Sequence, residues 1–326
     1  MQEWLADGSE PTLASIGEAA ALAAILPRLP RASTRLTGPG DDAAVLAAGD
    51  GRFVVTTDSL IQGPDFRIEW STPFDLGWKS AAVNLADIAA MGARPTALVV
   101  ALALPAELPV RALERFADGI AAACAELAPG CGVEGGDLAT SALVTVAVTA
   151  FGDLEGRAPV LRSGARSGDL VAVMGPLGRA AKGLAALYER GLAAAAEVPQ
   201  VDDQLRPRPP IAAGPIAAEH GATAMLDVSD GLVLDARRLA SASGVCLDLD
   251  VAAIQWTAGG YELGDLRFAL EGGEDHALLA TFPGDGMLPP GFRAIGRVLD
   301  GEGVFVDGVP YTESGGWDVF DDTLHL

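Results

Sequence analysis

The chain has 326 residues, half of them hydrophobic and 20% charged, with 40 glycines and 21 prolines. This apolar share, together with a mean hydropathy of +0.30, excludes an intrinsically disordered chain. The 44 acidic residues outnumber the 22 basic ones and give a net charge of −22, which argues against binding to nucleic acid or to an anionic membrane. The length predicts about two domains.

The chain begins with an acidic segment, 1–10, that lacks the basic and apolar regions of a signal peptide. The longest apolar stretches, such as Ala97–Leu104, are strand-sized and stop at proline, well short of the ~20 residues of a membrane helix. The three cysteines, Cys124, Cys131 and Cys246, form no CxxC pair. We therefore expect a cytoplasmic protein with buried thiols and no membrane partner.

The first half of the chain alternates helical and strand patterns. Helices are expected over Thr12–Leu26, Pro73–Gly92 and Pro109–Leu127, and strands over Ala43–Leu46, Phe53–Thr57, Thr96–Leu104 and Leu143–Phe151. The Gly-, Arg- and Pro-rich segment Gly152–Gly168 predicts a boundary. We place the two domains at 1–152 and 153–326.

The second half also mixes helices and strands. Helices are expected over Arg179–Leu192, after Arg206–Pro210 and over Leu232–Ser243, and strands over Leu170–Met174, Thr223–Val228, Val245–Val251, Ala277–Phe282, Ala294–Val298 and Val304–Val306. This order predicts an α+β protein made of two mixed α/β units.

One acidic residue interrupts an almost entirely apolar helix. The segment Ala81–Met91 should be buried, yet it carries Asp87, with Asn84 one turn earlier on the same stripe. An unpaired buried carboxylate costs several kcal/mol by rough estimate. Asp87 therefore needs a cation or strong donors, and we favour a metal over pairing with an arginine or capping of a neighbouring helix.

Further acids end other apolar runs, in GDDAAVL (40–46), VVTTDS (54–59), EGGD (134–137) and LDVSDG (226–231). Taken singly, each fits an ordinary turn or a helix N-cap. Together, their carboxylate and hydroxyl oxygens fit Mg²⁺, which proteins bind through a few carboxylates and the phosphates of a substrate. A chain of this charge would accept a nucleotide as its metal complex.

Common phosphate-binding and catalytic motifs are missing or unsuited. Residues 38–43 fit GxGxxA, but Asp41 and Asp42 in that turn would repel a bare pyrophosphate. The sequence contains no GxxxxGK[ST], GxSxG or HExxH motif and only three histidines. The glycine-rich turn 175–183 fits an anion-binding helix start and a plain tight turn equally well.

Eight motifs follow one another along almost the whole chain, namely GDDAAVL (40–46), TTDSLIQGPDF (56–66), AVNLADIAAMGARP (82–95), GGD (135–137), RSGARSGD (162–169), LDVSDGL (226–232), GGED (272–275) and GWDVF (316–320). In these ordered motifs the sequence resembles the thiamine-monophosphate kinase family. The wider superfamily includes aminoimidazole ribonucleotide synthetase, selenophosphate synthetase and a hydrogenase-maturation protein, all of which use ATP.

The resemblance implies transfer of a phosphoryl group from ATP to thiamine monophosphate, with several Mg²⁺ ions. It also implies an N-terminal unit that dimerises through its sheet and a C-terminal unit that closes over the site. The metal ligands would be Asp41, Thr56, Thr57, Asp58, Asp87, Asp137, Asp227 and Asp230; ATP would contact Gly136, Asp137, Arg162 and Ser229; the acceptor would contact Asp65, Glu274 and Trp317.

Three departures from the family pattern lie on or near the acceptor side. Asp65 stands where the family usually has histidine, GGEDYE is changed at His276, and GWDHF is changed at Val319. The alternatives are therefore another ATP-dependent enzyme of the superfamily with a different acceptor, or a non-catalytic nucleotide-binding protein. A further alternative for Asp65 is that it only caps the turn at Gly63 and Pro64.

Overall fold

The computed structural model describes residues 2–5, 10–38, 43–257 and 265–316. Four residues named in the sequence analysis, Asp41, Asp42, Trp317 and Val319, lie outside the described residues. The chain divides into two compact units, the first made of Met1–Ile88 and Arg94–Glu155 and the second of Ala89–Ala93 and Gly156–Leu326. Both units combine helices with a sheet, so the predicted α+β class is confirmed.

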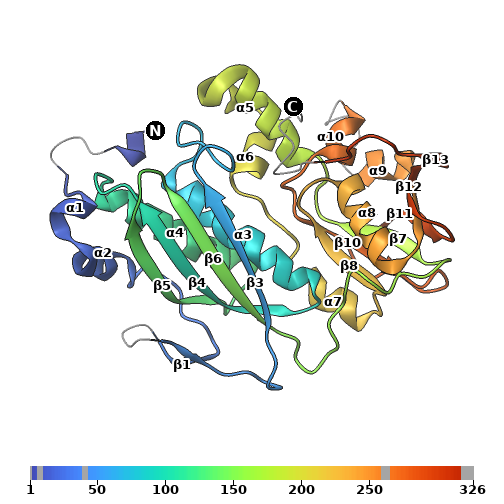
Figure 1. Ribbon diagram of the computed structural model, residues 1–326, viewed down its shortest axis with the longest axis horizontal. Coiled ribbons are helices and arrows are strands. Elements are labelled where there is room, and N and C mark those ends of the chain that lie inside the picture. The colour runs from blue at the N-terminus through green and yellow to red at the C-terminus, as the bar shows by residue number, and fades with distance from the viewer. Residues whose placement is uncertain (1, 6–9, 39–42, 258–264, 317–326) are drawn as a thin grey trace. The chain divides into compact units, whose positions relative to one another are not determined.

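The first unit is built on a four-stranded sheet (Figure 1). Its elements are η1 Gln2–Trp4, α1 Leu13–Ile16, α2 Glu18–Ile25, β1 Arg35–Thr37, β2 Val45–Leu46, β3 Val54–Ile61, α3 Pro73–Ala90, β4 Arg94–Leu104, α4 Val110–Leu127, β5 Gly132–Thr140 and β6 Thr145–Asp153. The sheet has the order β3-β6-β4-β5, in which only β4 and β5 are parallel, and β1 pairs with β2 separately. Strands β3 and β5 therefore form opposite edges.

The two faces of this sheet differ. Helices α3 and α4 cover one face, on which Val146, Val148 and Ala150 of β6 are buried (Figure 1). The alternating β6 residues on the other face are only partly buried, as period-two geometry requires. On β3 the same face exposes Val55 by 59% and Ile61 by 41%. We call this partly apolar surface the open face.

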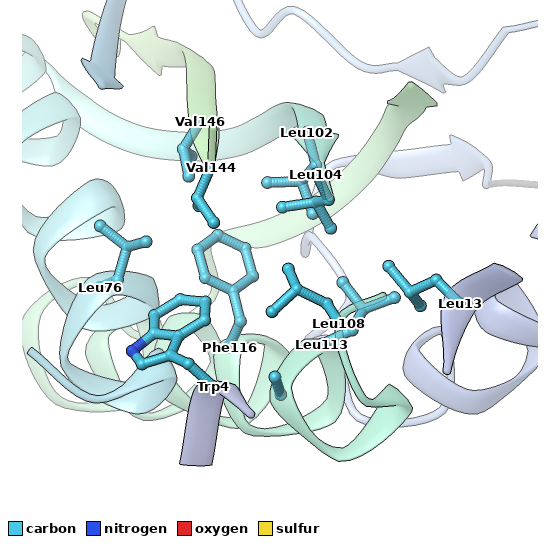
Figure 2. Close-up of a pocket in the computed structure, with 11 residues that line it drawn as sticks. Trp4, Leu13, Leu76, Leu102, Leu104, Leu108, Leu113, Phe116, Val144 and Val146 are labelled. Carbon is cyan, nitrogen blue, oxygen red and sulfur yellow. The ribbon is translucent and has the colours of Figure 1, made fainter. Parts of the chain in front are cut away.

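A small cavity lies within the helix-covered core of the first unit (Figure 2). Leu102 and Leu104 of β4 and Val146 of β6 line it together with Phe116 of α4, and Trp4 belongs to its wall. The Trp4 indole N–H donates to the carbonyl of Ser71 at 2.7 Å. Because its lining side chains are apolar, this cavity is a packing feature and offers no means of orienting a charged ligand.

The second unit holds a seven-stranded sheet with the order β13-β12-β9-β11-β7-β10-β8. Its elements are β7 Leu170–Met174, α5 Arg179–Ala195, α6 Gln200–Leu205, α7 Ala213–Glu219, β8 Ala224–Val228, α8 Leu232–Ser243, β9 Cys246–Leu249, α9 Val251–Thr257, α10 Leu266–Glu271, β10 Ala277–Phe282, β11 Arg293–Leu299, β12 Gly303–Val306 and β13 Val309–Pro310. Only β9 and β12 pair in parallel.

Side chains bury both faces of the central strands of this sheet. Ala224, Leu226 and Val228 of β8 pack with α8 and α10 in one core, whereas Met225, between Ala224 and Leu226, packs with α7 in a second core. All the residues of β8 and β10 are buried. Continuous apolar runs are typical of strands covered on both faces, which explains why these two strands were predictable.

Several predicted elements required correction. The helix expected over Thr12–Leu26 is interrupted at Gly17, where φ is +75°. Strand β3 runs on to Ile61, beyond the predicted Thr57. Strand β5 was not predicted because Glu134-Gly-Gly-Asp137 reads locally as a turn, and α6, α9 and α10 were also missed.

The three cysteines are buried and unpaired in disulfides, as expected. Among the described residues, we find no helix with the length and apolar character required to cross a membrane.

Candidate active site

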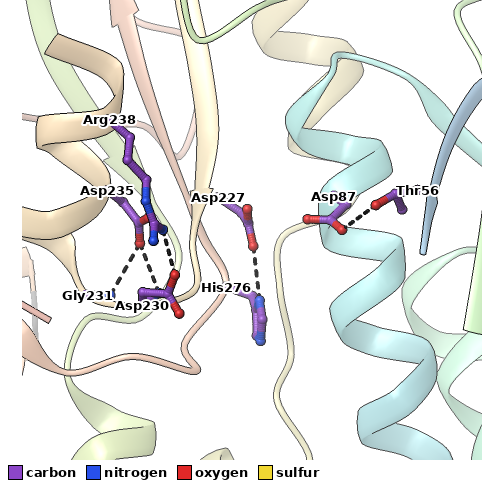
Figure 3. Close-up of polar contacts among 8 residues, drawn as sticks. All are labelled: Thr56, Asp87, Asp227, Asp230, Gly231, Asp235, Arg238 and His276. Carbon is purple, nitrogen blue, oxygen red and sulfur yellow. Dashed lines mark hydrogen bonds and ion pairs between the residues drawn. The ribbon is translucent and has the colours of Figure 1, made fainter. Parts of the chain in front are cut away.

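In the first unit, polar side chains from β3 and α3 meet. The Thr56 hydroxyl donates to a carboxylate oxygen of Asp87 at 2.8 Å (Figure 3). Because β3 is an edge strand, the backbone N–H of Asp58 is available to α3 and donates to the Asn84 side chain at 3.1 Å. The predicted pairing of Asn84 and Asp87 on one helical stripe is thus realised, with both side chains directed at β3.

Thr57 does not share this face of the strand. Successive side chains of a strand alternate, so Thr56 and Asp58 lie on the helix-covered face and Thr57 on the open face. There the Thr57 hydroxyl donates to the carbonyl of Val148 at 3.0 Å and accepts from the hydroxyl of Thr149. The structure therefore does not bring the Thr57 side chain together with Asp58 and Asp87.

Gly136 and Asp137 lie on β5, at the opposite edge of the sheet from β3. Asp137 is in register with Ala101, and this row continues through Ala147 to Ser59 of β3. Three interstrand spacings separate the two edges by about 14 Å. Asp137 also shares the open face with Ala101. Within one chain it therefore lies apart from Thr56, Asp58 and Asp87, which we call the β3–α3 group.

Gly136 is a position at which only glycine fits. A Cβ atom there would stand 2.1 Å from the carbonyl oxygen of Val100 in β4. The missing side chain allows the two parallel strands to approach and leaves the backbone at this point exposed. The GGD motif therefore combines accessible main chain with an exposed carboxylate, which is the arrangement expected of a phosphate–metal contact.

Asp65 closes the turn that follows β3. Its carboxylate accepts the backbone N–H of Ile61 at 2.7 Å, and its own N–H donates to the Ile61 carbonyl at 3.1 Å. These contacts are the ones expected of the turn cap. The side chain is partly exposed, so the cap does not prevent the carboxylate from facing a ligand.

In the second unit, Asp227 stands near the end of β8 and is buried. The Nδ1 atom of His276 lies 3.0 Å from its carboxylate (Figure 3). His276 is itself buried, and its backbone N–H donates to the Val228 carbonyl. The histidine that departs from the family pattern is therefore in direct contact with a predicted metal ligand.

Asp230 and Asp235 form a pair of carboxylates around one arginine of this unit. The Arg238 guanidinium lies 2.6 Å from a carboxylate oxygen of Asp230 and 2.6 Å from one of Asp235 (Figure 3). Asp235 also accepts the backbone N–H groups of Asp230 and Gly231. Burial raises the pKa of Asp235 to about 6, although the N–H of Asp230 and the Arg238 guanidinium act in the opposite direction.

The GGED segment (272–275) lies beside the loop Ser229–Gly231, which we call the SDG loop. The N–H of Glu274 donates to the Ser229 carbonyl at 2.7 Å, and a Cβ atom on Gly273 would meet that same oxygen at 2.5 Å. Glu274 and His276 both have positive φ, at 70° and 52°. Non-glycine residues in this conformation are uncommon and need support from their surroundings. The backbone thus places the predicted ATP residue Ser229 and the predicted acceptor residue Glu274 side by side.

Asp275 explains the glycine-rich turn before α5. Its carboxylate accepts the N–H groups of Gly178 and Ala180 at the start of that helix, at 2.5 and 2.9 Å. Burial raises the pKa of Asp275 to about 6, despite these two donors. The helix start is therefore occupied by the protein's own carboxylate, and of the two interpretations of this turn the structural one applies.

Arg162 lies on the surface in a segment held by Ser243. The Ser243 hydroxyl donates to the Arg162 carbonyl at 3.0 Å and accepts the N–H of Gly164 at 3.1 Å. The Asp169 carboxylate accepts the N–H of Arg166 and the hydroxyl of Thr223. Hydrogen bonds to Ser243 and Asp169 therefore hold the backbone of the RSGARSGD loop, and the Arg162 side chain on it is exposed.

The donor chemistry of these groups fits a hard divalent cation. Thr56, Asp58 and Asp87 supply hydroxyl and carboxylate oxygens from one face of β3 and from α3, and Asp227 and Asp230 supply carboxylates in the second unit. Oxygen ligands of this kind suit Mg²⁺. Among the described residues, no three His, Cys, Asp or Glu side chains gather closely enough to hold a metal on their own.

Several contributors were not predicted, namely Asp235, Arg238, Asp275 and Ser243. The spacing of Asp230, Asp235 and Arg238 was visible in the sequence and is compatible with one helix start. Asp275 and Ser243 gave no signal of their own because their partners lie 97 and 81 residues away in the chain.

The fold and these motifs match a known class of proteins. Residues 40–154 match the model of the AIR synthase related protein N-terminal domain, and residues 166–308 match that of its C-terminal domain. The chain is therefore an AIR synthase related protein.

Individual relatives narrow this class. A thiamine-monophosphate kinase from Mycobacterium tuberculosis is 48% identical over 96% of this chain and 94% of its own length. The crystal structure of thiamine monophosphate kinase from Aquifex aeolicus has a TM-score of 0.71 and 34% identity, covering 83% of this chain and 92% of that one. AaThiL complexed with AMPPCP and TMP has a TM-score of 0.73 and 35% identity over 86% and 91%. The chain belongs to the thiamine-monophosphate kinase family, which confirms the resemblance seen in the sequence.

Proposed function

We propose that this chain transfers the γ-phosphoryl group of ATP to the phosphate of thiamine monophosphate, giving ADP and thiamine diphosphate. The observation that carries the proposal is the 48% identity to a thiamine-monophosphate kinase over 96% of the chain. The likeness to AaThiL complexed with AMPPCP, an ATP analogue, and TMP supports both substrates. The chain is accordingly an enzyme of the kinase class, with ATP as its co-substrate.

Mg²⁺ ions would supply the positive charge that brings two anionic substrates together and stabilises the transferred phosphoryl group. Asp58, Asp87 and Thr56 would bind them from the β3–α3 group, whose donor set suits Mg²⁺. The proposed ligand set is Asp41, Thr56, Thr57, Asp58, Asp87, Asp137, Asp227 and Asp230. Thr57 belongs to the proposed set through the family resemblance alone, because its side chain lies on the open face, away from Thr56 and Asp58.

Four residues are proposed to contact ATP, namely Gly136, Asp137, Arg162 and Ser229. Gly136 offers exposed main chain next to the Asp137 carboxylate. Arg162 offers an exposed, planar cation suited to phosphate oxygens. Ser229 lies in the SDG loop directly before Asp230, so that one loop would contact both the nucleotide and a metal.

The acceptor is proposed to bind Asp65, Glu274 and Trp317. Glu274 lies next to the proposed ATP residue Ser229 in the second unit. Its carboxylate would balance the cationic thiazolium, and Trp317 would stack on a ring of the acceptor. The attacking group is a phosphate that is already anionic near neutral pH, so no side chain is required as a general base. The protein would act by orienting the two substrates for direct in-line transfer.

A homodimer would cover the open face. The exposed apolar side chains Val55 and Ile61 on β3 lie on a sheet face that the helices of the unit leave uncovered. A second copy packed on this face would bury them and would lie against Asp137. In this proposal residues 1–152 bind metal and ATP and dimerise, and residues 153–326 complete the nucleotide and acceptor sites. Light scattering should then return roughly twice the 33.2 kDa of one chain.

The decisive assay incubates the purified protein with Mg²⁺, ATP and thiamine monophosphate and measures thiamine diphosphate by chromatography. We expect product to appear with an equal amount of ADP. Reactions without Mg²⁺ or without thiamine monophosphate serve as controls. ADP formation without thiamine diphosphate would point to another acceptor, and binding of ATP without turnover would point to a non-catalytic protein.

A further inference from the structure

His276 lies directly before β10, where the chain enters the sheet of the second unit. The first residue of the strand, Ala277, pairs with Val228 of β8, and the N–H of His276 donates to the Val228 carbonyl at 2.9 Å. In this antiparallel register Leu278 stands opposite Asp227. His276 is therefore the diagonal neighbour of Asp227, close enough for the two side chains to meet, and its Nδ1 atom lies 3.0 Å from the carboxylate (Figure 3).

The backbone around His276 is held from both directions. The carboxylate of the preceding Asp275 accepts the N–H groups of Gly178 and Ala180 at the start of α5, and the N–H of Glu274 donates to the SDG loop. On the other side the chain continues into β10. His276 has φ of +52°, a conformation that costs free energy in a non-glycine residue and persists only where the surroundings fix it. The imidazole is therefore presented by a backbone whose position is already set.

Asp227 occupies an unfavourable place for a negative charge. Its side chain is only 5% exposed, and its neighbours on the same face of the sheet, Met225 and Leu278, belong to an apolar core. Burial raises the pKa of Asp235, and the charges of Asp230 and Asp227 add to this effect, so several carboxylates act on one another here. A buried carboxylate of this kind requires hydrogen bonds, a cation or both.

We propose that His276 is a positioning residue that orients Asp227 as a ligand of Mg²⁺. The inference rests on the proposed function, in which Asp227 binds a metal ion. A carboxylate only accepts hydrogen bonds, so the imidazole Nδ1 is the donor. Because a carboxylate has two oxygens, a hydrogen bond to one of them can fix its orientation while the other binds the cation. Loss of such a partner lowers metal affinity by roughly 10- to 100-fold in known sites.

The binding test compares His276→Phe with His276→Asn. Phenylalanine keeps a ring but has no donor, whereas asparagine carries an amide N–H close to the position of Nδ1 and adopts positive φ readily. Mn²⁺ serves as a paramagnetic probe for Mg²⁺ and is titrated in the presence of AMPPCP, with water proton relaxation reporting the protein-bound ion and nucleotide alone as the blank. We expect the dissociation constant of Mn²⁺ to rise about tenfold in His276→Phe and less than about threefold in His276→Asn.

Turnover gives a second readout. In His276→Phe the Mg²⁺ concentration that gives half-maximal activity should rise about tenfold, and kcat should recover to within about twofold of wild type at high Mg²⁺, because Asp227 itself remains. In the Asp227→Asn background, His276→Phe should change the affinity for Mn²⁺ by less than about twofold, because it acts through that carboxylate. Independent effects of the two substitutions would overturn the positioning role.

A matched control is Asp275→Asn, which alters the adjacent buried side chain but not the contact to Asp227. Its affinity for Mn²⁺ should stay near that of wild type. A loss of affinity in this variant as well would indicate a general disturbance of the segment and would overturn the role of the donor. Equal losses in His276→Phe and His276→Asn would overturn it too, because the imidazole itself would then be required.

Circular dichroism establishes that each variant is folded, and His276→Ala, which also lacks the donor, replaces His276→Phe if the larger side chain prevents folding. Unchanged affinity for Mn²⁺ in the variant without the donor would refute the positioning of Asp227, whether or not product forms. Absence of thiamine diphosphate in wild type, with Mn²⁺ affinities ordered as expected, would instead refute the proposed acceptor. The two failures are therefore distinguishable.

Discussion

The candidate carboxylates of the two units are held by different kinds of donor. In the first unit Asp87 accepts a hydrogen bond from the neutral hydroxyl of Thr56. In the second unit Asp230 is bound by the Arg238 guanidinium, and Asp227 contacts the imidazole of His276. The second unit therefore carries a counter-charge for Asp230, the Arg238 guanidinium, whereas the contact between Thr56 and Asp87 is a hydrogen bond from a neutral donor.

The ion pair at Asp230 bears on metal binding in the second unit. A carboxylate held by an arginine must exchange that partner for a metal, so the energy of metal binding is reduced by the loss of the ion pair. We therefore expect Mg²⁺ to compete with Arg238 for Asp230.

The largest effect is expected from Asp87→Asn, which keeps the shape of the side chain and removes its charge. Turnover should fall by about two orders of magnitude or more, as for loss of one preorganised charge-stabilising group. Folding should survive because the Thr56 hydroxyl can still donate to the remaining amide oxygen. Steady-state kinetics and circular dichroism would test this, with Asp118→Asn as a surface control in the same unit. Near-normal activity at limiting Mg²⁺ would contradict the metal assignment.

Arg238→Gln tests the role of the guanidinium that holds the carboxylates of the second unit. The substitution leaves the buried Asp235 and the neighbouring Asp230 without their guanidinium, so the free energy of unfolding should fall by about 1 to 3 kcal/mol. Mg²⁺ should then stabilise the variant more than wild type, because it no longer competes with the arginine. Denaturant unfolding with and without Mg²⁺ measures both effects, and Arg190→Gln on exposed α5 surface is the control. An equal Mg²⁺ response in both proteins would refute the competition.

Asp275 should make stability depend on pH in a defined direction. Its pKa is raised to about 6 in the folded protein, so between pH 4 and 6 the folded state holds the proton more tightly than the unfolded state. Raising the pH from 5 to 7.5 should therefore lower the free energy of unfolding by roughly 1 to 2 kcal/mol through this group.

Asp275→Asn removes this titration, although it also weakens one of the two contacts to α5. The stability difference between wild type and Asp275→Asn should accordingly be more favourable to wild type at pH 5 than at pH 7.5. Chemical denaturation of both proteins at the two pH values measures the difference. Parallel pH dependences would show that Asp275 does not titrate in this range.

The smallest effect is expected at Asp65, whose carboxylate caps a turn and is also proposed to face the acceptor. Asp65→His should lower the KM for thiamine monophosphate by a few-fold or leave turnover nearly intact, with little change in the KM for ATP. Asp65→Asn retains an acceptor for the Ile61 N–H and separates charge from capping. A change confined to the ATP constant would refute acceptor-side placement, and no change in either constant would leave the turn cap as the function of Asp65.

The sequence by itself determined the elements whose burial is continuous or strictly alternating. Strands β8 and β10 and helices α3, α4 and α8 follow the apolar pattern closely, because local periodicity and core burial favour the same structure there. Ordered motifs with intact acidic residues were also sufficient to identify the kinase family, because each motif is recognised from the types of its residues and their spacing.

Only the tertiary structure decided which groups meet. Strand β5 can pair closely with β4 because Gly136 has no side chain to collide with Val100. No local sequence pattern predicts this contact. Sheet order placed Asp137 on the opposite edge and face from Asp58, and long-range folding brought Asp275 to the start of α5 and Arg237 to the carbonyl of Tyr311. Hydrogen-bond partners distant in the chain are selected by the packing of whole elements, and residue spacing in the sequence carries no record of that selection.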